Sequence, residues 1–185
     1  MPASSGKYYP ETIGGRVFHG ATAAAGVALP ISTGTAVTFG LWNTSSNFNA
    51  VINRVNIGYT SGTIALGEFG IANQYCGFAI GTAAPLSAVQ TGTPKNGLLG
   101  AGAASAMTFI PAGTTTLTAG GTAAMWLGKS IESATAGLGV FDCSYDLDGQ
   151  LIVTPGMLIF LCGSVAQTGV FTCSMSWTEI PLGTY

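Results

Sequence analysis

The sequence predicts an all-β protein, and three observations support this prediction. First, 28 glycines and 8 prolines divide the 185-residue chain into short segments, and these two residues are the strongest local breaks in secondary structure. Second, the segments between them are rich in Val, Ile, Thr, Phe and Trp, which are enriched in β-strands. Third, the Ala-rich stretches at 20–28 and 97–107 contain too many glycines to form stable helices.

The predicted strands are short and numerous. Two hairpins are predicted, one with Ser61 and Gly62 in its turn, the other with Asp148 and Gly149 in the positive backbone angles of a type I′ turn. Strands of this number and spacing favour a two-sheet jelly-roll β-sandwich. The strands are expected at residues 16–19, 36–42, 50–60, 63–70, 75–80, 107–110, 123–127, 139–145, 151–153, 157–163 and 170–180.

The length of 185 residues fits one domain, which we expect to occupy residues 16–185. Residues 1–15 contain several prolines and glycines and are expected to form an extended N-terminal arm. Lys7, Tyr8 and Tyr9 lie on this arm and are the predicted partner-binding residues, because exposed aromatic residues are enriched at interfaces. In the alternative interpretation, the two tyrosines pack back on their own domain.

The last two predicted strands differ in pattern. "FTCSMSWT" (171–178) alternates apolar and polar residues, whereas every residue of "MLIFLC" (157–162) is apolar. If "AQTG" (166–169) is a two-residue hairpin loop, Cys162 lies opposite Cys173. The core face of that hairpin would contain Leu158, Phe160, Cys162, Cys173, Met175 and Trp177.

The reverse face of that hairpin would mix apolar and small polar side chains. A solvated monomer would need polar residues throughout this face. We therefore predict a subunit interface, with an arm or loop of the same chain covering Ile159 and Leu161 as the alternative. The predicted interface residues are Ile159, Leu161, Ser174 and Ser176.

The four cysteines, at 76, 143, 162 and 173, have no metal-binding spacing. They are expected to be buried thiols, with a disulfide between Cys162 and Cys173 left open. The same lack of ligand patterns leads us to expect no metal and no cofactor.

Charged residues make up only 6% of the chain, against about 25% in ordinary soluble domains. A surface with so little charge is expected to be covered by other subunits. The 5 basic residues are scattered singly, which argues against nucleic-acid binding. The sequence also contains no apolar signal-peptide core at its N-terminus and no run long enough to span a membrane.

Motifs for catalysis are weak. His19 has no Asp or Cys near it in the sequence, and a structural role is expected for it. Asp142, Asp146 and Asp148 lack the spacing of a calcium loop, and a weak cation site there is left open. We expect no enzymatic activity, since the only argument for an enzyme is that this fold is known to carry many different functions.

Four segments carry a resemblance to a known group of proteins: "VFHGATAAAGVALPISTGTAVTFGLWN" (17–43), "INRVNIGYTSGT" (52–63), "VTPGMLIFLCGS" (153–164) and "CSMSWTEIPL" (173–182). The chain resembles small structural proteins of tailed bacteriophages with a jelly roll of the tumour-necrosis-factor type. The resemblance implies a homotrimeric decoration or cement protein that binds the major capsid protein. It further implies a place on the capsid surface of the virion, after assembly in the host cytoplasm.

Two other virion functions remain as alternatives. A receptor-binding tip of a phage tail fibre would recognise host carbohydrate, with Trp42 and Trp126 as candidate contacts. A major capsid protein with a single jelly roll is the other alternative, and the lack of a basic interior arm argues against it.

Overall fold

The computed structural model describes residues 6–78, 86–87, 91–100, 102–112, 115–131 and 142–183. Parts of three predicted segments lie outside these residues: 1–5 of the arm, and 79–80 and 139–141 of two strands. The described elements are α1 (Tyr9–Ile13), β1 (Val17–Ala21), β2 (Val27–Ala28), β3 (Ala36–Val37), β4 (Gly40–Trp42), β5 (Phe48–Ser61), β6 (Gly67–Tyr75), β7 (Leu86–Ser87), β8 (Lys95–Asn96), β9 (Thr108–Ile110), β10 (Thr115–Leu117), β11 (Thr122–Ile131), β12 (Asp142–Val153), β13 (Met157–Gly163) and β14 (Val170–Pro181).

The predicted jelly-roll sandwich is confirmed by the strand order. Sheet A has the order β12-β5-β14-β1-β8, with β2 also paired to β14, and sheet B has the order β11-β6-β13-β4-β9. Strands near the start of the chain pair with strands near its end, and each following pair lies between the previous two strands in the sequence. The antiparallel pairs are β1 with β14, β4 with β13, β5 with β12 and β6 with β11. This is the jelly-roll pattern, in which a long two-stranded ribbon wraps around one core.

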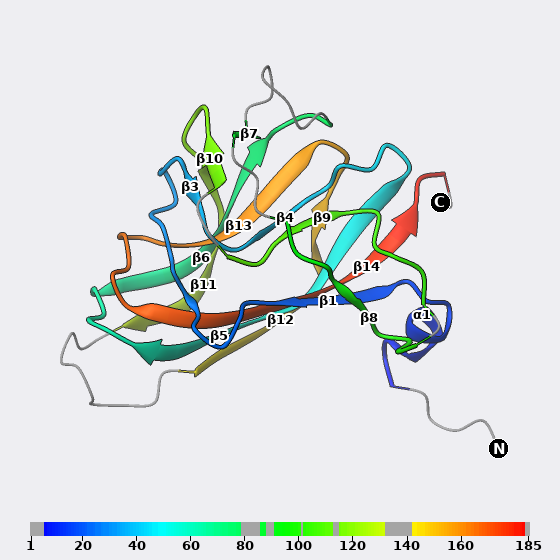
Figure 1. The fold of residues 1–185 in the computed structure, drawn as a ribbon, viewed down its shortest axis with the longest axis horizontal. Coiled ribbons are helices and arrows are strands. Elements are labelled where there is room, and N and C mark those ends of the chain that lie inside the picture. Colours follow the sequence, from blue (N-terminus) through cyan, green and yellow to red (C-terminus); the bar gives the residue numbers. More distant parts are fainter. Residues whose placement is uncertain are drawn as a thin grey trace.

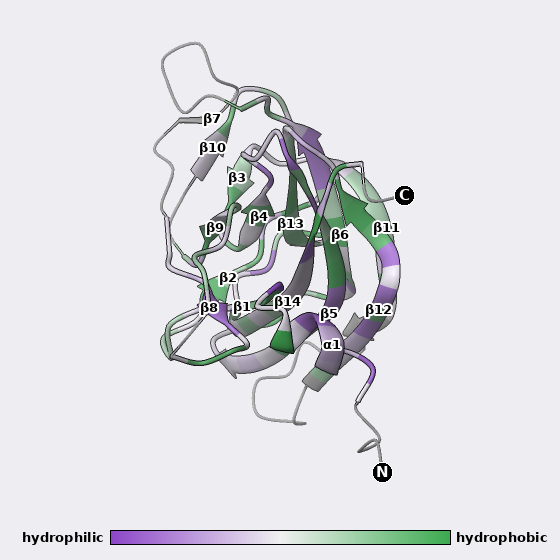
Figure 2. Ribbon diagram, turned by 90° about the vertical axis from the view of Figure 1, so that its right-hand side faces the viewer, coloured by the Kyte–Doolittle hydropathy of each residue, from purple (hydrophilic) through white to green (hydrophobic). Residues whose placement is uncertain are grey.

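A third, smaller sheet covers part of the sandwich. Sheet C has the order β3-β10-β7, and it lies at the upper left of Figure 1, beyond sheet B. Figure 2, turned by 90°, again places sheet B between sheet C and the strands of sheet A. Two of the strands in sheet C come from the long connection between β6 and β11. Sheet B is therefore an inner layer over part of its area.

This layering explains the wholly apolar sequence of β13. Ile159 and Leu161 point into the main core between sheets A and B. Leu158, Phe160 and Cys162 point the other way, into a second cluster that includes Val37 of β3 and Leu117 of β10. The five side chains from Leu158 to Cys162 have at most 2% of their surface exposed, because the strand has a protein layer on each face.

The predicted hairpin between the last two strands is wrong. β13 pairs with β4 and β6 in sheet B, whereas β14 pairs with β1, β2 and β5 in sheet A. Cys162 and Cys173 thus belong to opposite sheets and to different core clusters, and no disulfide joins them.

The other two predicted hairpins are also wrong, although both turn regions have positive backbone angles. Gly62 has φ 93°, but β5 and β6 on either side of it lie in different sheets. Asp148 and Gly149 have φ 48° and 87°. Here they form a bulge inside one strand, since β12 stays paired with β5 on both sides of it. The bulge places Leu147 in the main core.

The N-terminal segment is short and partly helical. The five-residue helix α1 begins with Tyr9 and a proline in its first turn, where the missing proline N–H is not needed. Arg16 then leads into β1, and its carbonyl accepts a hydrogen bond from the Glu179 N–H of β14. None of the described residues belongs to a helix with the length and hydrophobicity needed to cross a bilayer.

Candidate functional site: the outer face of sheet A

The outer face of sheet A carries rows of small and polar side chains. Residues directly opposite each other on neighbouring strands share one face, so the register of the sheet defines these rows. One row crosses five of the six strands of sheet A, and the next crosses four. The first row is Lys95, His19, Ser176, Arg54 and Asp146, and the second is Ala21, Ser174, Asn56 and Ser144.

A pocket of about 770 Å³ lies over these rows and around the edge of β1. This volume is within the range of about 300–1,000 Å³ that is typical of small-molecule sites. Its polar lining comes from the two rows, with Tyr8 and Thr93 added, and its apolar lining includes Phe109, Pro111 and Met175. Among the described residues that line the pocket, none is acidic.

The pocket reaches the edge of β1 because β8 is so short. β8 pairs only with Phe18 and His19, so the strand edge beyond His19 has no neighbouring strand in the described part of the chain. Gly20 is required at this point, since a Cβ atom there would lie 2.5 Å from the Phe109 ring. Phe109 thereby comes close to the backbone of β1 and forms a wall of the pocket.

The pocket floor is built from hydroxyl and amide groups. The Asn56 Nδ2 atom donates a hydrogen bond of 2.9 Å to Ser174 Oγ, which fixes the orientation of the amide and leaves its oxygen for another partner. Ser174 and Ser176 are half-buried. Partial burial lowers the pKa of His19, so this imidazole is a neutral donor or acceptor at pH 7.

The basic residues of the pocket differ in their partners. Arg54 makes a bidentate ion pair with Asp146, with Nε–Oδ1 and Nη2–Oδ2 distances of 2.5 and 2.9 Å, and the hydrogen bonds from Arg54 lower the pKa of Asp146. Two of the five guanidinium N–H groups are thus used and three remain. Lys95 is exposed and has no acidic partner among the described residues.

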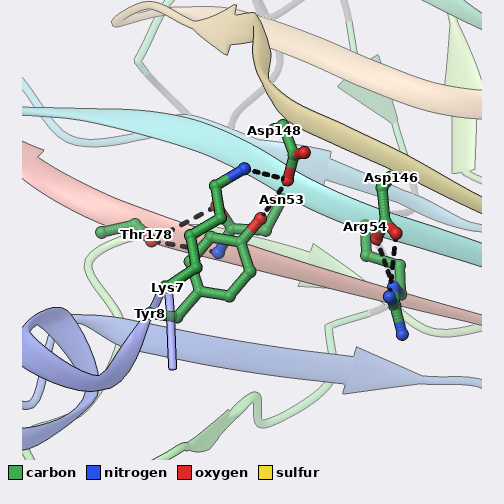
Figure 3. A network of polar contacts seen from close by, with 7 residues as sticks. All are labelled: Lys7, Tyr8, Asn53, Arg54, Asp146, Asp148 and Thr178. Carbon is green, nitrogen blue, oxygen red and sulfur yellow. Dashed lines mark hydrogen bonds and ion pairs between the residues drawn. The ribbon is translucent and has the colours of Figure 1, made fainter. Parts of the chain in front are cut away.

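The N-terminal segment is bound to the bulge of β12, as Figure 3 shows. The Lys7 Nζ atom lies 2.5 Å from Asp148 Oδ1, and the Tyr8 hydroxyl donates a 2.6 Å hydrogen bond to the same oxygen. Both bonds lower the pKa of Asp148. Burial, together with the hydrogen bond to Asp148, raises the pKa of Tyr8 to about 12. Of the three predicted partner-binding residues, Lys7 and Tyr8 are therefore held by their own domain, although the Lys7 side chain stays exposed, and Tyr9 is 53% exposed.

The predicted subunit interface divides between two places. Ile159 and Leu161 belong to sheet B and are buried inside the chain, at 2% and 0% exposure. The alternative, that the same chain covers them, is what the structure shows, so they offer no surface to a second subunit. Ser174 and Ser176 belong to sheet A and line the pocket.

The two tryptophans that were candidates for carbohydrate contacts differ in their exposure. Trp42 is fully buried and donates from Nε1 to the Gly77 carbonyl at 2.9 Å, so it is a core residue. Trp126 is 39% exposed on β11, and its ring packs on Gly70, where a Cβ atom would lie 2.6 Å from the ring.

Metal binding gains no support from the described side chains. No group of three or more potential ligands occurs among them. Asp146 and Asp148 are already paired with Arg54 and Lys7, and the side chain of Asp142 lies outside the described residues.

Burial keeps the thiols protonated. It raises the pKa of Cys76 to about 11 and the pKa values of Cys162 and Cys173 to about 12. Since the thiolate is the reactive form, these cysteines are unsuited to nucleophilic catalysis or metal binding at neutral pH.

The sequence did not reveal Arg54, Asn56 and Lys95 as site residues, and it assigned His19 a structural role. They lie on three strands that are distant in the sequence, β1, β5 and β8, and the signal that joins them is the cross-strand register. Comparison with known proteins found no matching family model, no matching curated protein and no matching solved structure.

Proposed function

We propose that this protein is a structural virion protein, a homotrimer that decorates and stabilises a bacteriophage capsid by binding the major capsid protein. The observation that carries the proposal is the internal pairing of its few charges. Lys7, Arg16 and Arg54 each bind a carboxylate of their own chain. The exterior therefore has even less free charge than the composition indicates, which favours a surface that packs against other proteins.

The proposed capsid contact is the exposed part of the N-terminal segment. Tyr9 and Ile13 of α1 are 53% and 55% exposed, whereas Lys7 and Tyr8 hold the segment to β12. In this proposal Lys7 and Tyr8 orient α1, and Tyr9 makes the contact. An aromatic side chain on a fixed support is well suited to this role, because little conformational entropy is lost on binding.

The capsid contact is tested by co-sedimentation with capsid shells that lack this protein. We expect Tyr9→Ala to weaken binding at least tenfold without changing the melting temperature. Tyr75→Ala is the matched control, because Tyr75 is a 61% exposed tyrosine on β6. Equal binding by Tyr9→Ala and the wild-type protein would remove the N-terminal segment from the proposed interface.

The homotrimer is tested by light scattering at micromolar concentration and after tenfold dilution. A persistent trimer supports the proposal, and a monomer at both concentrations contradicts it. The double variant Ser174→Arg/Ser176→Arg then asks whether sheet A carries the subunit contact. Dissociation of that variant would locate the contact on sheet A, and an intact trimer would locate it elsewhere.

A receptor-binding tail-fibre tip is the second candidate, and the exposed ring of Trp126 favours it. An aromatic ring packed on a glycine presents its other face as a rigid platform for a sugar ring. Binding to a glycan array that Trp126→Ala abolishes would support this function over capsid decoration.

A further inference from the structure

The pocket on sheet A combines a polar floor with an apolar wall, and a single class of ligand matches both. Its floor offers neutral hydroxyl and amide groups from Ser174, Ser176 and Asn56, and its wall offers the apolar surface of Ala21 and Pro111. A saccharide has the matching chemistry, since its hydroxyl groups form hydrogen bonds while its C–H faces pack on apolar and aromatic side chains.

The charges of the pocket specify the ligand further. Lys95 and Arg54 lie at the two ends of the part of the first row that lines the pocket, and Asp146 continues the row beyond Arg54. Lys95 and Arg54 are three strands apart, so their Cα atoms are separated by about 14 Å. No acidic residue lines the pocket among the described residues. A ligand in the pocket meets at one end the cation of Lys95, which is unpaired among the described residues, and at the other end the Arg54 side chain, whose charge is already paired with Asp146.

Lys95 is the basic residue of the pocket whose charge is available to a ligand. In a chain with so few charges, the other basic residues with described side chains pair with carboxylates of the same chain, and Lys95 does not. An anionic group on a ligand would form a charge-assisted hydrogen bond with it, which is stronger than a bond between neutral groups.

We propose that this pocket binds an acidic saccharide, with the carboxylate of the sugar on Lys95 and its hydroxyl groups on Ser174, Ser176 and Asn56. The remaining N–H groups of Arg54 lie at the other end of the ligand, and Pro111 packs against a sugar face. This inference does not rest on the capsid function, because the pocket belongs to a single chain.

The proposal is tested by titrating the isotope-labelled protein with 3′-sialyllactose and following backbone amide resonances by NMR. Lactose is the matched neutral probe, because it lacks only the acidic sugar. We expect saturable shifts at the β1, β8 and β14 residues of the pocket with sialyllactose. Lactose should bind at least tenfold more weakly, since it cannot form the charged hydrogen bond. Raising the NaCl concentration should weaken the binding of sialyllactose.

Two variants separate the pocket from general charge effects. Lys95→Gln should weaken sialyllactose binding at least about tenfold, since it replaces the cation with a neutral polar group on a side chain one atom shorter. Arg16→Gln is the control, because Arg16 also loses one positive charge but pairs with Glu11 and does not line the pocket. It should bind as the wild-type protein does.

Four results would overturn the proposal. They are the absence of saturable shifts at 10 mM sialyllactose, shifts located outside the pocket, equal affinity for lactose, and equal affinity for a short poly-glutamate peptide. A protein that forms capsid-bound trimers yet binds no sialyllactose would retain the proposed function and lose only this inference.

Discussion

β13 and β14 are neighbours in the sequence and differ in what lies on their two faces. β14 has Phe171, Cys173, Met175 and Trp177 in the core and half-buried small polar residues on the reverse face. β13 is buried on both faces, because sheet C and its connections cover the side that points away from the main core. The pattern of polar residues along a strand thus reports how many protein layers surround it, and this is independent of which strand it pairs with.

The comparison is tested most strongly at Phe160, which points from β13 into the second cluster. We expect Phe160→Ala to lower the free energy of unfolding by about 3–5 kcal/mol, because it leaves a cavity in a fully buried site. Ser176→Ala changes the outer face of β14 and should stay within about 0.5 kcal/mol of wild type. Urea denaturation of both variants measures the difference. A loss below 1 kcal/mol for Phe160→Ala would mean that sheet C adds little to the core.

A smaller effect is expected at Asn43, which joins the end of β4 in sheet B to strands of sheet A. Its Nδ2 atom donates hydrogen bonds of 2.8 Å to the carbonyls of Phe48 and Val153, and its side-chain oxygen accepts from the Ser45 N–H. Asn43→Ala leaves these groups without partners and should destabilise the protein by about 2–4 kcal/mol. Thermal unfolding measures the loss, and Asn47→Ala, at an exposed position of the same loop, is the control. Equal stability of the two variants would show that the Asn43 contacts are dispensable.

Cys162 and Cys173 lie in the two different core clusters, and the pH dependence of stability reports on the burial of both thiols. Burial raises the pKa values of Cys162 and Cys173 from 9.0 to about 12, so the unfolded chain releases these protons first. The stability they provide is complete below pH 9 and falls as the pH rises toward 12, by about 1 kcal/mol per thiol at pH 10. Urea midpoints at pH 8 and pH 10 should therefore converge in Cys162→Ala/Cys173→Ala. An unchanged pH dependence in that variant would show that other groups cause it.

The smallest effect is expected for the N-terminal segment, which is attached by exposed contacts. Asp148→Asn removes the ion pair with Lys7 and should speed tryptic cleavage after Lys7 without shifting the global unfolding midpoint. The lowered pKa of Asp148 gives the sign of the pH effect: the contact is present at neutral pH and is lost as the pH falls below 3.8. Asp146→Asn is the control, since Asp146 binds Arg54. Equal cleavage rates in both variants would argue against this attachment.

The strands themselves were predictable, and their partners were not. The sequence predicts β13 at 157–163 with the observed bounds, and β14 to within one residue. Two of the three predicted hairpins fail because a jelly roll places consecutive strands in opposite sheets, and the third fails because its turn residues lie inside the single strand β12. Local turn residues such as Asp148 and Gly149 specify backbone angles, and these angles fit a bulge as well as a hairpin.

The candidate site was predictable only in part. Ser174, Ser176 and Tyr8 were singled out by the sequence, and all three line the pocket. Arg54 and Lys95 were not, because each is a single charged residue in its own segment. They meet across sheet A only through pairing between segments that are distant in the sequence.

The nesting of the strands has a consequence for synthesis on the ribosome. Val17 of β1 pairs with Thr178 of β14, so the first strand to be synthesised cannot form this pairing until the last strand has been synthesised. At translation rates of about 5–20 residues per second, this wait lasts roughly 8–30 s. During that time the middle of sheet A is missing, and the nascent chain exposes unpaired strands that carry almost no charge. Its protection from aggregation in this interval must come from chaperones or from the ribosome surface.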